Sequence, residues 1–400
     1  MGRVLLEEIQ KGTKSATMKR RIVTHFIYNG DATITDLSKD MDLSIPTITK
    51  LIDEMCEDGY VDDNGKLETN GGRHPNLYGL NPDAAYFLGV VVARTYLSFC
   101  VVNFKGDVLD YRTNIPFKRE NNVECLDKMC DEILSYIDSL PYDKNKYLNV
   151  CISLHGRVNP YTGCSFGTFN FAQTPVSEMV SERIGLNVCI DNDSRTTAYG
   201  EYMKHSVKCP KNVIFINVSW GLGLAIIIDG KLYDGMSGFA GEFGHNYGYD
   251  NQQICHCGKK GCIETEVSCS ALYRKFIERI KKGESSVVLK DKSVGDITLD
   301  DIFDAIEKED VLAIELIEEI GHELGRHIGG LINIFNPEQV IIGGELSRSG
   351  DYLLHPVISA IRKHTLNMMY RDSDIVLSEL RESANAIGSA LLARSNLFVI

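Results

Sequence analysis

The sequence holds little tryptophan, no long apolar run and no excess of positive charge. It has a single tryptophan, Trp220, compared with 15 Phe and 18 Tyr. No apolar stretch approaches the roughly 20 residues that cross a bilayer, and the polar residues 1–16 lack the apolar centre of a signal peptide. A net charge of −13 and a pI near 5.3 argue against general affinity for nucleic acid or an anionic membrane. These absences predict a cytoplasmic protein with no membrane partner.

Length and cysteine content set the broad class. With 400 residues, 44% of them hydrophobic, the chain is expected to fold as two or three globular domains. It has 12 cysteines, and in a reducing compartment those that bind no metal are expected to be free thiols.

The segment 240–266 is organised around one histidine and three closely spaced cysteines. Zinc takes four tetrahedral ligands from thiolate and imidazole groups, and glycines between the thiols allow the tight turn that brings the sulfurs together. The candidate ligands are His245, Cys255, Cys257 and Cys262. Four protein ligands leave no position for water, so the pattern predicts a structural Zn²⁺ site. The alternative is that these cysteines are buried or redox-inert thiols.

Two carboxylates flank this segment. Glu242 lies three residues before His245, and Glu264 lies two residues after Cys262. A metal that fixes the segment would also fix these carboxylates, which can accept hydrogen bonds from the hydroxyls of a sugar.

The N-terminal region has the pattern of three short helices, expected at 18–29, 35–41 and 44–55. Thr35 is the expected cap of the second helix, and Ser44 that of the third, which has Pro46 in its first turn. An inward apolar stripe on the third helix consists of Ile48, Leu51, Ile52 and Met55. Two short strands, one at 59–61 and one near Leu67, should follow, joined by a turn at 63–65. The order predicts a winged helix-turn-helix.

The candidate DNA contacts lie on the third helix and on the wing. The outward side chains Thr47, Thr49 and Lys50 suit base edges and phosphates, and Arg73 on a glycine-rich tip suits a minor groove. Residues 1–80 hold ten Lys or Arg and thirteen Asp or Glu, so phosphate contacts would need a local stripe. The expected stripe is Lys11, Lys14, Lys19, Arg20 and Arg21. The alternative is a small helical bundle for protein contacts.

From residue 86 the pattern changes to strands. They are expected at 87–93, 96–102, 108–111, 147–154 and 187–193, with helices at 123–140 and 194–204. Polar residues follow two of these strands, namely the loop 155–159 and the pair Asn192 and Asp193. After the cysteine segment the chain is mainly helical, with strands expected at 338–345 and 375–377.

Three stretches resemble the signatures of the ROK family of repressors, open reading frames and kinases. They are GEFGH at 241–245, CHCGKKGCIE at 255–264 and, as in the repressors, GGRHP at 71–75. The resemblance covers almost the whole chain. It implies an α/β protein with the two-lobed sugar-kinase, actin-like ATPase fold, whose lobes are ribonuclease H-like, behind an N-terminal winged helix-turn-helix domain. The expected domains are 1–80 for DNA binding, 81–195 plus 384–400 for the small lobe, and 196–383 for the large lobe.

The resemblance also implies a sugar site. Its expected contacts are Asn192, Asp193, Glu242, His245 and Glu264, with His245 also serving as a zinc ligand. In ROK kinases the residue that corresponds to Asp193 is the general base that deprotonates the sugar hydroxyl. The same carboxylate can instead only accept a hydroxyl hydrogen bond, and it can also cap the helix that follows.

The two segments that bind nucleotide phosphates in ROK kinases are altered. Val91 and Ala93 replace the aspartate and glycine of the first segment, where only Thr95 remains. Trp220 and Leu224 replace a small hydroxylated residue and a glycine in the second. These changes make bound ATP and Mg²⁺ unexpected.

The function that these features favour is that of a sugar-responsive transcriptional repressor, in the ROK branch that includes the N-acetylglucosamine and xylose repressors. Its expected partners are double-stranded operator DNA, a sugar or sugar phosphate, and further copies of itself in a homodimer or homotetramer. The alternative is an ATP-dependent hexose kinase that uses Asp193 as general base. A scaffold would leave the polar cleft residues unexplained.

Overall fold

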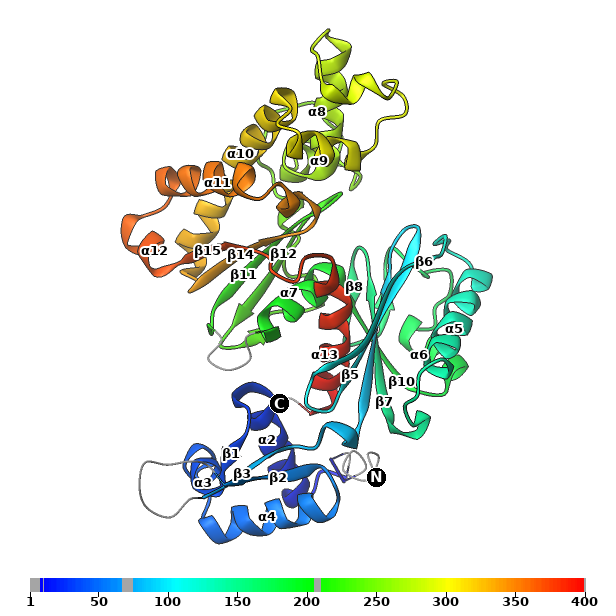
Figure 1. Ribbon diagram of the computed structural model, residues 1–400, viewed down its shortest axis with the longest axis vertical. Coiled ribbons are helices and arrows are strands. Elements are labelled where there is room, and N and C mark those ends of the chain that lie inside the picture. Colours follow the sequence, from blue (N-terminus) through cyan, green and yellow to red (C-terminus); the bar gives the residue numbers. More distant parts are fainter. Residues whose placement is uncertain (1–7, 10, 67–74, 205–209, 399–400) are drawn as a thin grey trace. The chain divides into compact units, whose positions relative to one another are not determined.

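The computed structural model describes residues 8–9, 11–66, 75–204 and 210–398, which form two compact units (Figure 1). The first is Met1–Cys209 with Ser383–Ile400, and the second is Pro210–Glu382. Helix α7 (Asp193–Lys204) lies wholly in the first unit. The expected division after residue 195 therefore passes through a helix, and the chain crosses between the units after that helix has ended.

The winged helix-turn-helix consists of three helices and a small sheet. The helices are α2 (Lys14–Asn29), α3 (Ile34–Met41) and α4 (Ile45–Glu57), and the sheet has the strand order β1-β3-β2. Ser44 caps α4 as predicted, and the predicted apolar stripe of that helix is buried. The prediction that Thr35 caps α3 is wrong. Thr33 is the cap, because Asp36, three residues later, returns a bond to its backbone N–H in a capping box.

The predicted turn at 63–65 is also wrong. Strand β2 (Val61–Lys66) continues through these residues and pairs antiparallel with β3 (Asn76–Leu80) rather than with a strand near Leu67, which lies outside the described residues. Gly65 takes a φ of +88° within an irregular stretch of the pairing. Its N–H bonds Asp63 Oδ1 at 2.9 Å, so the left-handed residue is absorbed by a bulge.

Each of the two units contains a five-stranded sheet with the same order and directions. In the first unit the order is β10-β7-β4-β5-β6, and in the second it is β13-β12-β11-β14-β15. In both, the first three strands of the chain are antiparallel and the last two join in parallel. The first sheet uses β4 (Tyr86–Val92), β5 (Tyr96–Asn103), β6 (Val108–Pro116), β7 (Tyr147–Leu154) and β10 (Asn187–Asn192). The second uses β11 (Val213–Val218), β12 (Leu222–Ile228), β13 (Lys231–Leu232), β14 (Gln339–Gly343) and β15 (Asp374–Leu377).

Helices complete both units. In the first unit, α5 (Val123–Asp138) and α6 (Val176–Ile184) share one apolar core with the sheet, while α7 and α13 (Ala384–Phe398) pack together on the sheet's other side (Figure 1). In the second unit the core joins the sheet to α8 (Cys269–Lys281), α9 (Leu299–Glu307), α10 (Val311–Phe335) and α11 (Asp351–His364), with α12 (Asn367–Asp372) at its edge. The predicted α/β fold with ribonuclease H-like lobes and a winged helix is confirmed.

Among the helices that the structure describes, none combines the length and the apolar character that a membrane crossing requires.

Helices α7 and α13 are held unusually close by glycines. A Cβ at Gly200 would lie 2.2 Å from Ala384 O, and one at Gly388 would lie 1.8 Å from Thr196 O. Thr196 Oγ1 also donates to Asn385 Oδ1 at 2.7 Å. Because the atoms that such a Cβ would meet belong to the backbone, neither helix can yield locally, and the two are expected to move as one body.

The replacement Gly388→Ala is therefore expected to lower the free energy of unfolding by about 1–3 kcal/mol through overpacking. The matched control is Gly330→Ala in α10, where an added Cβ meets nothing within 4 Å. That control should leave stability unchanged or raise it by up to about 1 kcal/mol, since alanine favours helix. Urea denaturation followed by circular dichroism would measure both, and equal effects would contradict the close packing.

Candidate functional site

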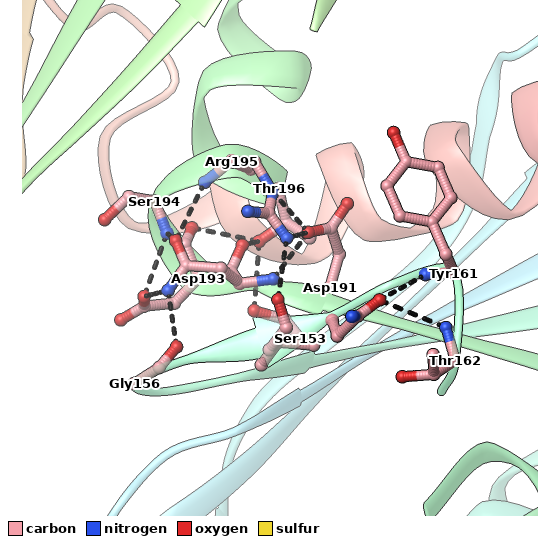
Figure 2. A network of polar contacts seen from close by, with 12 residues as sticks. Ser153, Gly156, Tyr161, Thr162, Asp191, Asp193, Ser194, Arg195 and Thr196 are labelled. Carbon is pink, nitrogen blue, oxygen red and sulfur yellow. Dashed lines mark hydrogen bonds and ion pairs between the residues drawn. The ribbon is translucent and has the colours of Figure 1, made fainter. Parts of the chain in front are cut away.

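The polar turn that ends β10 lies beside the loop that follows β7 (Figure 2). These strands are parallel neighbours, so their carboxyl ends share one edge of the sheet. Asn192 joins the two: its Nδ2 donates to Gly156 O at 2.9 Å, and its Oδ1 accepts from Ser194 N at 2.9 Å. The Asn192 side chain thus holds the loop in place and also caps the start of α7.

Asp193 uses both carboxylate oxygens within the turn. Its Oδ2 lies 2.9 Å from His155 Nδ1, and its Oδ1 accepts from Ser194 N at 2.9 Å and Asn192 Nδ2 at 3.0 Å. Asn192 and Asp193 therefore both cap α7. The Asp193 side chain remains 25% exposed and that of His155 58% exposed, so a ligand can reach this pair. The sequence placed the loop of His155 near the site without assigning the histidine a role.

A buried ion pair lies beneath this turn and was missed from the sequence. Arg195, 2% exposed, donates through Nε to Asp191 Oδ1 at 2.6 Å, and Asp191 also accepts from Asn192 N at 2.6 Å. Arg195 further reaches Val158 O at 3.5 Å. The only signal in the sequence is an Asp and an Arg four residues apart at a strand-to-helix junction, which also occurs without such a role.

Arg119 is a second residue that sequence reasoning missed. Its backbone N–H bonds Arg94 O at 3.1 Å, which holds the segment after β6 against the turn between β4 and β5. Burial lowers the pKa of its guanidinium, while the charge of Asp193 opposes this shift. The Arg119 guanidinium and the Asp193 carboxylate therefore attract each other electrostatically.

In the second unit the four predicted metal ligands converge. One donor atom from each of His245, Cys255, Cys257 and Cys262 lies within 4.8 Å of the others. The Cys257 and Cys262 sulfurs are 3.6 Å apart, and Cys255 Sγ lies 3.5 Å from His245 Nδ1. Zn–S bonds of about 2.3 Å and Zn–N bonds of about 2.0 Å at tetrahedral angles imply separations of about 3.8 and 3.5 Å. The two separations are thus close to those of a tetrahedral zinc site.

The knuckle turn depends on its glycines. Gly258 and Gly261 have φ values of +86° and +77°, and a Cβ at Gly261 would lie 2.3 Å from Tyr249 O. The predicted tight turn between the second and third thiols is therefore present, for the conformational reason expected.

Glu264 ties this knuckle to the start of β12. Its Oε1 accepts from Cys255 Sγ at 3.0 Å and lies 2.7 Å from His256 Nδ1, while its Oε2 accepts from Leu222 N at 3.3 Å. Glu242 is more open, with its side chain 41% exposed and Oε2 3.6 Å from His245 Nε2. The second unit therefore brings together Glu242, His245 and Glu264, whereas Asn192 and Asp193 belong to the first.

The segment that resembles a second phosphate loop is occupied by protein contacts. Trp220, 54% exposed, stands between β11 and β12, where its carbonyl accepts from Ser270 N at 3.3 Å. Leu224 is buried in the core, and a Cβ at Gly221 would come within 3.0 Å of Glu264 Oε2. Gly221 thus has a structural reason to be glycine without any phosphate.

The candidate DNA surface is the first half of α4. Thr47 and Thr49 are partly exposed, and the Lys50 side chain is 80% exposed. Thr49 Oγ1 donates to Ile45 O at 2.9 Å, which leaves its lone pairs available as acceptors. A surface depression of about 560 Å³ beside these residues is lined further along by acidic side chains, which repel phosphates; they are Asp53, Glu54 and Glu57. Arg73 lies outside the described residues.

The predicted basic stripe is wrong in part. Lys19 is buried and pairs with Glu8 at 3.5 Å, Glu54 at 3.2 Å and Asp58 at 3.6 Å. Burial would lower the pKa of Lys19, but the hydrogen bond to Glu54 and the surrounding negative charges raise it. Arg20 and Arg21 donate to backbone carbonyls of the first unit. Lys11 and Lys14 remain exposed, so the accessible positive charge of this stripe lies at the start of α2 and just before it.

Removal of the buried guanidinium should be costly. In Arg195→Met the Asp191 carboxylate would stay buried without its partner, so the free energy of unfolding should fall by about 3–5 kcal/mol. The control is Arg183→Met, which breaks the more exposed pair with Asp127 and should cost no more than about 1 kcal/mol. Urea denaturation of the full chain measures both changes, and a small loss for Arg195→Met would contradict a structural role for the pair.

Comparison with known sequences agrees with this architecture. The profile described as ROK family matches residues 87–396, and that described as winged helix-turn-helix DNA-binding matches residues 17–62. The xylose repressor of Caldicellulosiruptor bescii is 29% identical over 366 residues, which make up 91% of this chain and 92% of that protein.

Two solved structures extend the comparison. A ROK family transcriptional regulator, homologous to the Escherichia coli MLC protein, superposes with a TM-score of 0.81 and 26% identity over 96% of this chain and 97% of its own. A ROK family glucokinase from Streptomyces griseus, in complex with glucose and AMPPNP, gives a TM-score of 0.68 and 28% identity over 78% of this chain and 100% of its own. The regulators match this chain nearly end to end, whereas the kinase matches about three quarters of it. The chain therefore belongs to the ROK family, and its two matched regions are those of a ROK transcriptional regulator.

Proposed function

We propose that this protein is a transcriptional repressor whose affinity for operator DNA changes when a sugar or sugar phosphate binds its ROK domain. The observation that carries the proposal is the joint presence, in one compact unit, of a winged helix-turn-helix and an accessible polar turn around Asp193. The first part suits double-stranded DNA, and the second suits a ligand rich in hydroxyl groups.

The proposed sugar contacts are Asn192, Asp193, Glu242, His245 and Glu264. His245 can serve both metal and sugar because its two nitrogens face different groups: Nδ1 lies by Cys255 Sγ, and Nε2 lies on the side of Glu242. With zinc on Nδ1, the Nε2–H remains a donor. With zinc bound, Cys255 is a thiolate that no longer donates, and Glu264 keeps its contacts with His256 Nδ1 and Leu222 N, out of the roughly four that a carboxylate can accept. Its remaining capacity is available to a sugar hydroxyl.

The proposed DNA contacts are Thr47, Thr49 and Lys50 at the start of α4, with Arg73 on the wing. In helix-turn-helix proteins the first residues of the recognition helix face base edges, and dimers read two half-sites about one helical turn apart. Because such proteins read two half-sites as dimers, we propose that this protein forms a homodimer or homotetramer. We also propose that it acts in the cytoplasm. The acidic end of α4 would then point away from the DNA backbone.

A metal-pinned knuckle would keep one wall of the sugar site rigid. Zinc there would have four protein ligands and no water position, so its contribution would be structural: it would fix His245 and the turn that carries Glu264, two residues after the ligand Cys262. The chain's own residues then orient and bind the sugar.

The alternative function, a hexose kinase with Asp193 as general base, is favoured by the accessible carboxylate of that residue. Against it, Val91 and Ala93 replace the acidic and glycine positions of one phosphate segment, and Trp220 and Leu224 alter the other. Loss of both segments would remove the groups that hold nucleotide phosphates and magnesium. We therefore propose that the protein senses the sugar without phosphorylating it.

The test has two steps. Thermal shift with D-glucose, D-xylose, N-acetyl-D-glucosamine and the 6-phosphates of glucose and N-acetylglucosamine identifies a ligand, because binding to the folded state raises the melting temperature. Fluorescence anisotropy with a duplex selected from a random pool then measures DNA affinity with and without it. We expect a change of roughly 5- to 150-fold. ATP-dependent turnover of a panel sugar that Asp193→Asn abolishes would establish the kinase instead.

Lys50 allows the DNA surface to be tested separately. Lys50→Ala should weaken binding to all duplexes and reduce the salt dependence of log K by about one unit, because one phosphate contact is lost. The control is Lys281→Ala in α8, which is also exposed and lies in the second unit. An unchanged salt slope for Lys50→Ala would contradict the assignment of this face.

Zinc content is the third test. Wild-type protein and the control Cys164→Ser are expected to hold a single equivalent of zinc by plasma mass spectrometry, since Cys164 lies in the other unit. Cys257→Ser should lose most of the metal and melt at a lower temperature, because one of four ligands is gone. Wild-type protein purified without zinc, and unable to bind it when it is supplied, would overturn the metal site.

A further inference from the structure

The first helix of the winged domain, α2, is hydrogen-bonded to α13 and to α7, the helix that begins at the polar turn of Asn192 and Asp193 (the ligand turn). On α7, Tyr199 OH lies 2.6 Å from Ser395 Oγ of α13 and 3.4 Å from Tyr28 OH of α2. At the end of α13, Phe398 O accepts from Thr24 Oγ1 at 2.9 Å and Arg20 Nε at 3.2 Å. Three side chains of α2, namely Arg20, Thr24 and Tyr28, therefore make polar contacts with α7 or α13.

Aromatic packing surrounds this contact. Phe398 is fully buried, with its ring centre 5.2 Å from that of Phe104, and Phe104 lies 6.3 Å from Tyr60 of the winged domain. Lys105 adds an ion pair with Asp31 at 3.4 Å. The winged domain thus packs against the end of α13 through buried aromatic rings surrounded by polar contacts. Such close packing opposes displacement of the winged domain along α13.

The same two helices lie at both crossings between the units. Helix α7 ends at Lys204, shortly before the second unit begins at Pro210, and α13 begins at Ala384, just after that unit ends at Glu382. Any rearrangement of the second unit relative to the first acts on the chain at these two places. Helix α7 also begins at Asp193, in the ligand turn, and the glycine contacts at Gly200 and Gly388 lock α7 to α13.

We propose that α7 and α13 form a rigid coupling rod that carries the ligand state from Asp193 to the winged domain, through the Tyr199–Tyr28 contact and the hydrogen bonds to Phe398 O. This inference rests on the proposed function, and it adds the route of regulation. Burial raises the pKa of Tyr28 further above its usual value, so its hydroxyl remains a neutral hydrogen-bonding group. The rod is a single structural element that contacts both the ligand turn and the winged domain. Such an element provides a physical route for coupling between the two sites.

The variant that tests the rod is the double replacement Tyr28→Phe with Thr24→Val, which removes two hydroxyls and keeps side-chain shape. Neither residue touches the ligand turn or the DNA face of α4. The matched control is Tyr136→Phe, which removes another buried hydroxyl, bonded to Asp110 Oδ1 at 2.7 Å within the same unit. The control separates loss of coupling from general destabilisation.

The readout is amide hydrogen exchange over α2 in the full-length protein, with two separate perturbations of the ligand turn. One is addition of a panel sugar that binds, and the other is the replacement Asp193→Asn, which needs no ligand. In the wild-type and Tyr136→Phe backgrounds, each perturbation that acts on the turn should change exchange rates in α2, by on the order of fivefold. In the double variant the change should fall by at least about half, since two hydrogen bonds of the contact are gone.

Two results would overturn the rod: α2 exchange that does not respond to Asp193→Asn in the wild-type background, or an equal response in the double variant. If no panel sugar binds, the proposed function fails for those sugars, while the Asp193→Asn arm still decides the rod. If a sugar changes DNA affinity but α2 exchange stays constant, the regulator stands and the rod is wrong.

Discussion

The structure depends most on the hydrogen bonds that Asn192 and Asp193 make where β10 becomes α7. Asn192 donates to Gly156 O in the neighbouring loop, and the Asp193 carboxylate contacts His155. Both side chains also accept a hydrogen bond from Ser194 N in the first turn of the helix. The buried pair of Asp191 and Arg195 holds this turn from below. A polar site is thereby built into the start of a buried helix, where a ligand that alters the site must also act on that helix.

The two units use one topology for different chemistry. In the first unit the polar turn follows two parallel strands, and in the second the metal knuckle and Glu264 are attached to the turn that begins β12. Trp220 and Leu224 lie in the segment of the second sheet that resembles a phosphate loop. Leu224 fills core, and Gly221 makes room for Glu264. In this chain the segment that resembles a second phosphate loop thus takes part in the packing of the second unit.

Strong local patterns could be predicted from the sequence. The knuckle, the cap at Ser44, the strands of the first sheet and two strands of the second, β14 and β15, follow from residue types at short spacing, and the structure has them where expected. Long-range contacts could not be predicted. In the sequence Lys19 looks like a free phosphate contact, but in the folded chain it pairs with Glu54 and Asp58. The residues Asn64-Gly65 look like a turn, but they lie in the bulged part of β2, which pairs with β3. Arg195 and Tyr28 have roles that only their distant partners reveal.

The central claim is that sugar binding and DNA binding to the same chain change each other's affinity. Isothermal titration calorimetry of a binding sugar, on the free protein and on the protein saturated with its duplex, tests this most directly. By linkage, the two sugar dissociation constants must differ by the same factor by which the sugar changes DNA affinity. Equal dissociation constants in the two states would contradict the account.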